Sequence, residues 1–580
     1  MIRIFFFLVL ASLLLAPVAG AQDWINVKLN EDTTQQLQNE QQVVVNPTDP
    51  LNLVSVWRDF RLGYRQVGYA YTFDGGATWT NPGLFVDVHY PRDSDPALTV
   101  NSDGDFFAML LAYTGNTNQP NGMLMYRSTD GGMTWEDRGF AINQVPGVFE
   151  DKEFIACDRS GSAYDGRIYM VWDRFYETNI YCVSTGDEGD NWTSERRVSD
   201  QSSNQFPTPA VGHDGTIYVA WTYFGGYIRF DKSTDGGLTF GSDRNVTSVY
   251  NPHPTLNGGI ESPAHPAMDV DISDGPYDGR IYIAYLNRSG SSDYDIYVRF
   301  SDDQGSSWSN AIRINDDAFN NGRDQFHPWL TVDNSGVVTA VWLDRRHDPS
   351  NLEWHCYISQ STDGGLNWSP NQQVSTMPSH PYDTAQGEGI EVDYAADRIE
   401  KMERGPKLPG PIRRAMEREK QVANADLTEE GWEPRPDQET GRAGTIGEYI
   451  GIASYDGFAT AVWTDTRHGH QDTYAGVEEA LNAVEEPLPA SVQMRIGPNP
   501  ADGPVGIRYQ VPADGRVTME LFDVEGRRVR TLVDRKLRAG DHAFVWDGTD
   551  QLGRPVASGT YWVRYAAEGA EESASIRVRR

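Results

Sequence analysis

Charged side chains recur at two places in a strand pattern that repeats along this 580-residue chain. Guanidinium groups bind carboxylates in a bidentate manner, and carboxylates accept hydrogen bonds from hydroxyl groups. If both sets face one cavity, they predict recognition of a carboxylated or polyhydroxylated sugar. The groups at the starts of first strands are Arg92, Asp93 and Asp95; Asp151, Lys152 and Glu153; Glu261 and His265; Arg323, Asp324 and His327; and Glu448 and Tyr449. The groups at the ends of second strands are Arg58, Asp59 and Arg61; Asp173 and Arg174; Arg288; Asp344, Arg345 and Arg346; and Asp465 and Arg467.

Six copies of the phrase Ser/Thr-x-Asp-x-Gly-x-x-Trp/Phe set the frame for these residues. Their aspartates lie 48 to 68 residues apart, a period typical of propellers and similar arrays. The carboxylate can accept backbone N–H groups inside a tight turn, and glycine allows a positive φ. We therefore interpret these aspartates as structural, not catalytic. They are Asp74, Asp130, Asp187, Asp235, Asp303 and Asp363.

A second apolar strand recurs seven times, once more than the Asp turns. The copies span residues 53–59, 107–113, 167–173, 216–222, 280–286, 337–344 and 458–465. The seventh repeat lacks a fourth strand, whereas residues 24–30 (WINVKLN) resemble one and precede a first strand at 41–46. Pairing of these two ends would close a ring and remove a free sheet edge. We expect an all-β fold: a seven-bladed β-propeller closed by the N-terminal strand, followed by a small C-terminal Ig-like β-sandwich.

Strand polarity divides the connections between two faces. The Asp turns and the first-to-second turns lie on one face, and the other connections lie on the opposite face, where we expect the site. The predicted binding residues are Arg58, Arg288, Arg345, Arg346, Asp151, Glu153, His265, Asp324, His327 and Glu448.

Three segments divide the chain. Residues 1–21 read as a signal peptide, with Arg3, an apolar core and a small-residue cleavage site near Ala21, and the apolar run is too short to span a bilayer. Residues 22–485 form the expected propeller, with an insertion at 377–447 that is either a lid or a solvated excursion. Residues 486–580 form the expected sandwich. We predict a secreted or surface-displayed bacterial protein without a transmembrane helix, and a monomer.

The formal charge of −34 argues against nucleic-acid partners and anionic membranes. The three cysteines, Cys157, Cys182 and Cys356, are too few for a disulfide framework and read as apolar fillers. The histidines show no zinc spacing, and we expect no cofactor. The oxygen-rich turns Asp158–Gly166 and Asp269–Gly279 leave calcium open as an alternative to ordinary polar turns.

The six phrases resemble the Asp-box, or BNR, repeats of the sialidase superfamily, over roughly residues 24–480. The tail resembles the Ig-like domain of flagellar hook-capping proteins and the C-terminal sorting domains of type IX secretion. That second resemblance implies export, with the secretion machinery as a partner. It is carried by Asn499-Pro500, Phe522–Arg527, Gly540, Trp546–Gly548, Gly553 and Ala557–Tyr561.

The sialidase resemblance implies a tyrosine nucleophile with a glutamate partner, an aspartate acid and an arginine triad for the sugar carboxylate. Tyr449, Glu261 and either Asp93 or Asp95 match the first three roles, and Arg288 with Arg345 or Arg346 match part of the triad. The chain departs from the family in lacking an Arg-Ile-Pro motif and in its seven expected blades, where sialidases have six. The recurrent Trp-x-Asp-x-Arg motif at 57–61, 342–346 and 463–467 favours a structural ion pair.

Three functions stay open at this point. The leading one is a propeller that binds glycan or another extracellular polymer through a charged central funnel. The second is an exo-acting glycoside hydrolase of sialidase-like type, or one that uses two funnel carboxylates. The third is an adhesion module without a small-ligand site, whose funnel would be plugged by side chains.

Overall fold

The computed structural model describes two all-β parts. It covers residues 24–115, 119, 121–145, 147–175, 177–288, 290, 292–381 and 446–478, and in the C-terminal part residues 494–497, 505–512, 515–524, 526–537, 540–546, 548–551, 554, 556–567 and 570–579. The expected signal peptide and most of the expected insertion lie outside these residues. Within them, no helix is long and apolar enough to cross a membrane.

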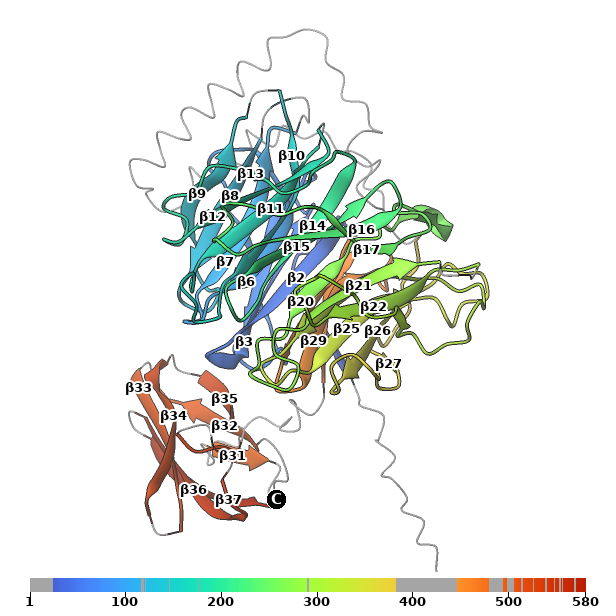
Figure 1. The fold of residues 1–580 in the computed structure, drawn as a ribbon. Coiled ribbons are helices and arrows are strands. Elements are labelled where there is room, and N and C mark those ends of the chain that lie inside the picture. The colour runs from blue at the N-terminus through green and yellow to red at the C-terminus, as the bar shows by residue number, and fades with distance from the viewer. Residues whose placement is uncertain are drawn as a thin grey trace, which may run out of the picture.

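Residues 24–478 contain seven antiparallel sheets of four strands each in the described segments (Figure 1). Sheets 1 to 3 follow the chain order strand by strand. Sheet 1 contains β2 (Gln38–Asn46), β3 (Asp49–Asp59), β4 (Gln66–Thr72) and β5 (Thr80–Leu84). Sheet 2 contains β6 (Arg92–Val100), β7 (Phe106–Tyr113), β8 (Gly122–Ser128) and β9 (Glu136–Asn143). Sheet 3 contains β10 (Glu150–Cys157), β11 (Ile168–Arg174), β12 (Asn179–Thr185) and β13 (Arg196–Arg197).

Sheets 4 to 6 repeat the same order. Sheet 4 contains β14 (Asn204–Val211), β15 (Ile217–Tyr223), β16 (Tyr227–Ser233) and β17 (Arg244–Ser248). Sheet 5 contains β20 (Ala267–Val270), β21 (Ile281–Asn287), β22 (Asp295–Ser301) and β23 (Ile312–Arg313). Sheet 6 contains β24 (Gln325–Val332), β25 (Val338–Asp344), β26 (His355–Ser361) and β27 (Gln372–Gln373). Between sheets 4 and 5 lies a hairpin made of β18 (Thr255–Leu256), the 3₁₀ turn η1 (Asn257–Gly259) and β19 (Ile260–Glu261).

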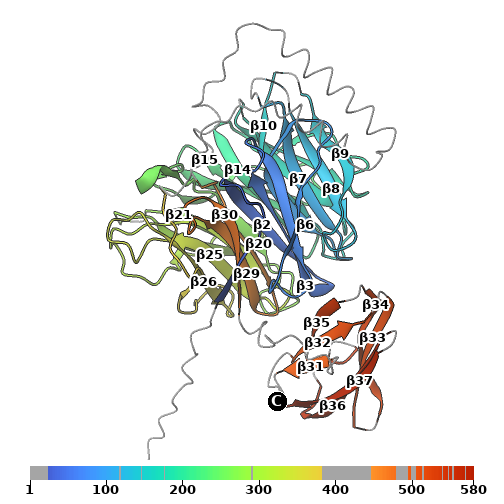
Figure 2. The same ribbon diagram turned by 180° about the vertical axis from the view of Figure 1, so that it is seen from behind.

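Sheet 7 draws its strands from both ends of this part of the chain. It contains β28 (Gly451–Tyr455), β29 (Phe458–Asp465), β30 (Asp472–Glu478) and β1 (Trp24–Lys28). β1 pairs with β30 antiparallel, with Trp24 opposite Glu478 and Val27 opposite Ala475. Each first strand contacts the first strand of the next sheet, and β28 in turn contacts β2, which lies beside β30 and β29 in Figure 2.

The second strand of each sheet is mostly apolar because neighbouring sheets cover both of its faces. β7, β11 and β25 are buried at every residue. Their side chains contribute to cores that include the fully buried tryptophans Trp172, Trp221 and Trp342. These strands fall where the sequence predicts them, since a continuous apolar run fits only a strand with two covered faces.

The Asp turns join third to fourth strands and fasten each sheet to the one before it. In all six turns the aspartate carboxylate accepts the backbone N–H of the residue four positions later, at 2.7 to 2.9 Å. The second glycine of a turn approaches the preceding sheet closely: a Cβ on Gly132 would lie 2.5 Å from Val54, and one on Gly76 would lie 2.6 Å from Val477 of β30. Glycine is therefore required there by close packing as well as by its positive φ.

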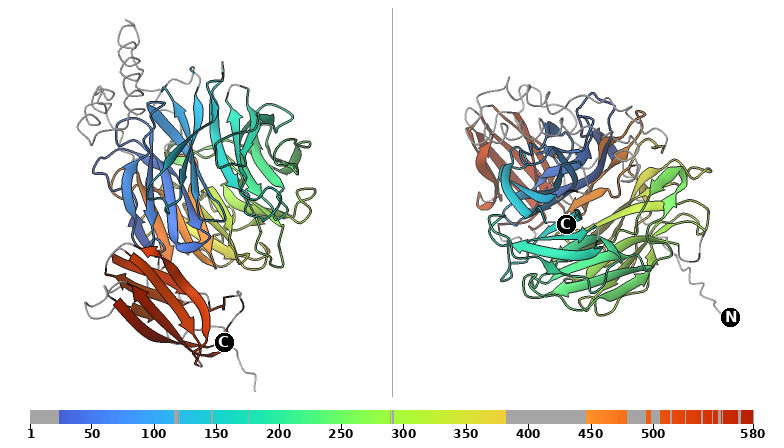
Figure 3. Two further views of the ribbon diagram at one scale, coloured as in Figure 1. Left: turned by 90° about the vertical axis from the view of Figure 1, so that its left-hand side faces the viewer. Right: turned by 90° about the horizontal axis from the view of Figure 1, so that it is seen from above.

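The C-terminal part is a sandwich of two sheets with its own core. One sheet contains β31 (Met494–Gly497), β32 (Val505–Val511) and β35 (Gly540–Trp546). The other contains β34 (Arg528–Leu537), β33 (Gly515–Phe522), β36 (Gly559–Ala567) and β37 (Ala570–Val578). Its buried core includes Ile507, Trp546 and Tyr565. It contacts the larger part through β35 and β3, and the left view of Figure 3 shows the red sandwich at one end of the larger part.

Candidate functional site

A bulge in the first strand of five sheets brings one side chain per sheet out of the regular pattern. The pairing register shifts at Glu40, Asp95, Lys152, Phe206 and His327. Each of these residues has a positive φ between 47° and 58°. A bulge with left-handed backbone redirects a side chain at some conformational cost, and such features gather at functional sites.

Three of these bulge residues meet two further charges in what we call the central charged cluster: Glu40, Arg58, Asp95, Lys152 and Glu448. Arg58 Nη1 lies 2.9 Å from Glu40 and 3.8 Å from Asp95, and Lys152 Nζ lies 2.7 Å from Asp95 and 2.5 Å from Glu448. All five residues are at most 6% exposed. The cluster joins sheets 1, 2 and 3 to the segment that precedes sheet 7.

Burial raises the pKa of some acids in and beside the cluster, whereas neighbouring cations lower the pKa of another. Burial raises the pKa of Glu40 to about 8 against the pull of Arg58. At Asp95 burial also opposes ionisation, but Lys152, Arg58 and Arg65 outweigh it and hold the pKa below its usual range. Burial raises the pKa of the neighbouring Asp151 to about 6. Carboxyl groups with well-separated pKa values are typical of acid–base sites.

Two further acids next to the cluster lack hydrogen-bond partners among the described residues. Both carboxylate oxygens of Glu153 and of Asp173 are buried without one, and burial raises the pKa of each well above its usual value. We therefore expect both side chains to be neutral. Such groups are rarely left in a protein interior without a role.

Beside the charges, four rings from four different segments form an aromatic cluster: Phe154, His265, Trp329 and Tyr449. The ring of Tyr449 lies 5.2 Å from Phe154, 6.0 Å from Trp329 and 6.3 Å from His265, measured between centroids. His265 bonds Thr208 Oγ1 through Nε2 at 3.1 Å, and burial lowers its pKa to about 3. His265 is therefore neutral at physiological pH, and side chains fill the space where sheets 3, 5, 6 and 7 approach one another.

Tyr449 differs from an exposed nucleophile in its surroundings. It is 2% exposed and its hydroxyl donates a hydrogen bond to the Pro96 carbonyl oxygen at 3.1 Å. Burial, with Glu40 and Asp95 nearby, raises its pKa well above the usual value. Glu261, its expected partner, lies on β19 of the hairpin, where its carbonyl oxygen accepts a hydrogen bond from His327 Nε2 at 3.2 Å.

The arginines that the sequence groups together have separate partners. Arg288 stacks on Tyr250, with 4.7 Å between the guanidinium carbon and the ring centroid. Arg345 is fully buried, donates to the Asn257 carbonyl oxygen at 2.8 Å and lies 3.7 Å from Asp324. Asp324 itself accepts the Tyr294 N–H at 3.0 Å, so it supports the local backbone.

Arg346 belongs to the recurrent Trp-x-Asp-x-Arg motif. Its Nη2 lies 2.8 Å from Asp344, which also accepts the Trp342 indole N–H, and its Nη1 reaches Asp316 beyond sheet 5. Arg467 makes the same ion pair, with its Nη2 2.7 Å from Asp465, and it also donates a hydrogen bond to the side-chain oxygen of Asn26 on β1 at 2.9 Å. Arg346 therefore links sheet 6 to the end of sheet 5. Arg467 links β29 to β1 within sheet 7 and also reaches Thr376 after sheet 6 at 3.1 Å.

The remaining polar features have local partners. Asp158 accepts hydrogen bonds from Ser160 N and Ser162 Oγ of its own turn, and Asp271 accepts one from Ser273 N. Calcium binding in these turns stays a prediction. The three cysteines are buried and free, and burial raises the pKa of Cys157 and Cys182 to about 12, so their thiols are unreactive.

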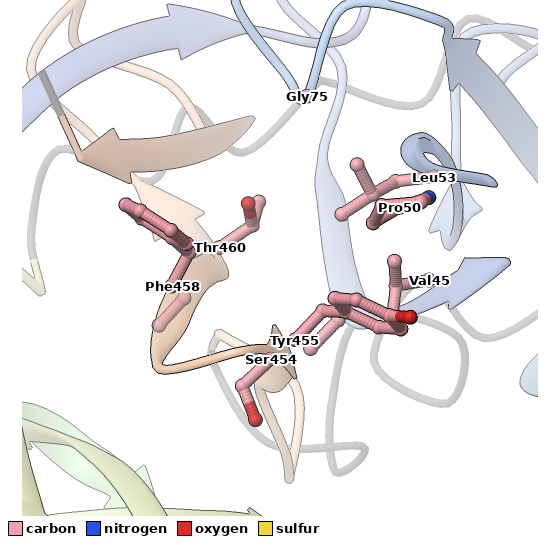
Figure 4. A pocket seen from close by; sticks show the side chains of 10 residues that line it. Val45, Pro50, Leu53, Gly75, Ser454, Tyr455, Phe458 and Thr460 are labelled. Carbon is pink, nitrogen blue, oxygen red and sulfur yellow. The ribbon is translucent and has the colours of Figure 1, made fainter. Parts of the chain in front are cut away.

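A small pocket lies away from these clusters, between sheets 1 and 7 near the first-to-second turns. Phe458 and Thr460 line one side, and Val45, Pro50 and Leu53 line the other (Figure 4). Its volume of 20 Å³ has room for about one water molecule. It therefore offers no space for a sugar.

Glu40 was not among the residues predicted from the sequence, and Lys152 was assigned no role of its own, although both lie in the central charged cluster. One signal was present: Asp95-Pro96, Phe206-Pro207, His265-Pro266 and His327-Pro328 recur in or just before first strands. Proline cannot donate to a sheet ladder and is confined to edges and bulges. The recurrence therefore marks the bulges at Asp95, Phe206 and His327, but not those at Glu40 and Lys152.

Comparisons with known proteins agree with these two parts. The BNR repeat-like domain family matches residues 175–384, and the FlgD Ig-like domain family matches residues 499–571. A sialidase of Micromonospora viridifaciens is 25% identical over 246 residues, which cover 40% of this chain and 31% of that protein. The basal-body rod modification protein FlgD of Salmonella typhimurium is 45% identical over 64 residues, 11% of this chain and 27% of that protein. The chain thus spans about a third or less of either relative.

Similar solved structures include an intramolecular trans-sialidase from Ruminococcus gnavus, with 13% identity and a TM-score of 0.39 over 55% of this chain and 92% of that one. Another is an α-L-arabinofuranosidase from Fusarium graminearum, with 13% identity and a TM-score of 0.40 over 58% of this chain and 97% of that one. Two stretches of the all-β chain are thus matched by family models: residues 175–384 by the BNR repeat-like domain family and residues 499–571 by the FlgD Ig-like domain family.

Proposed function

We propose that the chain is a secreted or surface-displayed seven-bladed β-propeller, closed by β1, that binds a glycan or another extracellular polymer on the face away from the Asp turns. The seven four-stranded sheets, the β1–β30 pairing and the contact between β28 and β2 support the closed ring. The observation that carries the binding proposal is the set of bulges that gathers Glu40, Asp95 and Lys152 into one charged cluster.

Exposed aromatic side chains lie in the connections of this same face. Phe175 and Phe224 follow second strands, and Tyr250 follows the fourth strand of sheet 4, with exposed fractions of 43%, 38% and 67%. Aromatic rings offer a large flat apolar surface beside polar groups, which suits the apolar face of a sugar ring. The aromatic cluster fills the centre, so we expect a ligand to lie across this face, not to enter deep between the sheets.

The test is a glycan and polysaccharide panel with the chain from residue 22 onward. A double variant, Phe224→Ala with Tyr250→Ala, should weaken binding by about tenfold or more, the effect of losing well-buried aromatic anchors. The matched control is Leu238→Ala with Leu366→Ala, since both leucines are exposed to a similar degree in the Asp turns of the other face. Equal loss in both variants, or no ligand in the panel, would contradict the proposal.

A glycoside hydrolase is the second candidate, and the half-buried Asp151 is the observation that favours it. Its pKa of about 6 suits a general acid, and Asp95 nearby stays ionised. A sialidase-type mechanism is less well supported, because Tyr449 is buried and bonded to Pro96 and the arginines have separate partners. On sialoside and neutral polysaccharide panels we expect any activity to survive Tyr449→Phe and to be lost in Asp151→Asn. Loss in Tyr449→Phe alone would restore the sialidase mechanism.

The C-terminal domain is proposed to engage secretion machinery or to attach the protein outside the cell, on the strength of its FlgD-type Ig-like match. If so, deleting residues 486–580 should change the location of the protein in culture fractions without changing its ligand.

We also propose that the protein is a monomer.

A further inference from the structure

The hairpin between sheets 4 and 5 has a fixed position that the polymer-binding proposal does not explain. Ser262 N donates to the Pro254 carbonyl and Ala264 N to the Pro252 carbonyl, at 3.0 and 2.8 Å. Arg345 holds the turn from sheet 6 through the Asn257 carbonyl. The hairpin is therefore fastened at its base and at its tip, and its side chains keep a defined place.

Glu261 of the hairpin and His253, which lies just before the hairpin, converge with Glu448 of the central charged cluster. His253, Glu261 and Glu448 each offer a ligand atom, and these atoms lie within 4.8 Å of one another. The ring of His253 is stacked on Phe206, the bulge residue of sheet 4, with centroids 5.9 Å apart. Phe206 thus holds the imidazole in place while its nitrogens remain available.

These three residues have side-chain nitrogen and oxygen atoms that remain available to bind a ligand. In the described segments, the His253 ring and the Glu261 carboxylate make no hydrogen bond or ion pair with protein. Glu448 is 6% exposed and is ion-paired through one oxygen with Lys152 at 2.5 Å. Such a contact from outside the ligand set orients a coordinating carboxylate, as hydrogen-bonded neighbours commonly do in metal sites.

A further polar atom beside the site lacks a partner. His327 is 3% exposed, bonds the Glu261 carbonyl through Nε2, and its Nδ1 has no hydrogen-bond partner in the described part of the chain. His327 thus brings a buried ring nitrogen that has no hydrogen-bond partner among the described residues next to Glu261.

We propose that His253, Glu261 and Glu448 bind one divalent transition-metal ion of the zinc class. An imidazole nitrogen with two carboxylates suits Zn²⁺ or Mn²⁺, whereas Ca²⁺ takes oxygen ligands only. Three protein ligands leave a coordination position open for water or for a hydroxyl group of a ligand on this face. The proposal does not rest on glycan binding, since the ion would be held by protein groups alone.

The test uses the full chain, stripped with a chelator and titrated with Zn²⁺, Mn²⁺ and Ca²⁺ separately by calorimetry, with metal content measured after dialysis. We expect about one Zn²⁺ or Mn²⁺ per chain and no comparable Ca²⁺ binding. Glu261→Gln and His253→Ala should each weaken the affinity by at least about tenfold. Both residues are partly exposed and their side chains make no hydrogen bond to the residues that the structure describes, so the variants should fold, which circular dichroism checks.

His213→Ala is the matched control, because His213 is a surface histidine 2.9 Å from Asp278 and 3.6 Å from Asp274. Its loss should leave the stoichiometry unchanged. Cobalt substitution gives an independent signal: a visible absorption band that requires Glu261 and His253. Failure of the wild-type chain to retain metal, or equal retention in the His253→Ala/Glu261→Gln double variant, would overturn the site, whatever the glycan panel shows.

Discussion

Lys152 Nζ lies 2.7 Å from Asp95, joining the first-strand bulges of two consecutive sheets through one buried ion pair. The same ammonium group contacts Glu448 before sheet 7, so a single lysine neutralises carboxylates from two other segments. Its pKa stays raised despite burial because Asp95, Glu448 and Glu40 surround it. This lysine is therefore both a link between sheets and the main counterion of the cluster.

Replacing Lys152 with methionine should destabilise the protein by about 3–5 kcal/mol, because the buried Glu448 would lose its ion pair and Asp95 would lose the nearest of its cations. Urea denaturation followed by tryptophan fluorescence measures the loss. Lys232→Met is the control, since Lys232 bonds the Gln304 side chain at 2.8 Å on a partly exposed strand and should cost about 1 kcal/mol or less. Equal losses for the two lysines would show that the cluster does not depend on this charge.

Removing residues 24–30 should lower the melting temperature of the larger part and promote aggregation. β30 would keep β29 but lose β1, and its backbone groups on that side would form an exposed sheet edge. Asn30, which bonds Asp472 at 2.8 Å and accepts the Thr473 N–H at 2.9 Å, would be lost with it.

Deletion of residues 486–580 serves as the comparison for this truncation. The C-terminal sheets have their own core, so the larger part should melt nearly as in the full chain. Calorimetry measures the melting temperature of both truncated proteins. An unchanged melting temperature without residues 24–30 would rule out the closing role of β1.

The stability of the folded state should fall as the pH rises between about 4.5 and 8, owing to Glu40. Its pKa is 4.5 when unperturbed and is raised to about 8 in the fold, so in this window the folded state binds a proton that the unfolded state has lost. Stability then decreases with pH, because its slope follows the protons bound in the unfolded state minus those bound in the folded state. Glu40→Gln should flatten the decrease.

Denaturation at about pH 5, 6.5 and 8 measures this dependence. Glu31→Gln provides the control, because Glu31 is an exposed glutamate in the connection that leads to β2. A Glu40→Gln profile parallel to the wild type would mean that Glu40 is ionised across the whole range.

Asp235→Ala should destabilise the protein by about 1–3 kcal/mol. Its carboxylate accepts hydrogen bonds from Thr239 N at 2.9 Å, Leu238 N at 3.0 Å and Ser233 Oγ at 2.6 Å, and charge-assisted bonds contribute more than neutral ones. Those bonds lower its pKa from 3.8 to about 2, although slight burial opposes them. The contribution is present above about pH 3.8 and is lost as the pH falls towards 2.

Thr234→Ala, in the same turn but exposed, should change the stability little. The difference between the two variants should shrink in denaturation curves measured at low pH. A difference that persisted at about pH 2 would exclude the ionised carboxylate as its source.

The repeating elements could be read from the sequence because each carries a local signal. The Asp turn needs its aspartate and glycines, and a strand covered on both faces must be apolar, so β7, β11 and β25 fall close to their predicted ranges. The fourth strands β13, β23 and β27 are only two residues long, and β31, β34 and β37 of the sandwich were not predicted. Short or edge strands have weak patterns because few of their side chains are buried.

The site was less predictable for a different reason. Glu40 and Lys152 occupy equivalent bulges, yet neither is followed by proline, so the chain offers no local mark for them. Tyr449 stands where the sialidase resemblance places a nucleophile, but its ring packs on Phe154 and Trp329, contacts that depend on three distant segments. The hairpin that bears Glu261, and His253 just before it, also lie outside the repeat, so the repeat gave no reason to expect them.

The direction of β30 has a consequence for how the molecule presents itself. As a third strand it ends on the side of the Asp turns, and the sandwich that follows contacts β3 of sheet 1. If the Ig-like part is a tether, as proposed, its attachment would lie on the side away from the surface that bears His253 and Tyr250. The proposed tether and the proposed polymer would then be held on opposite sides of the molecule.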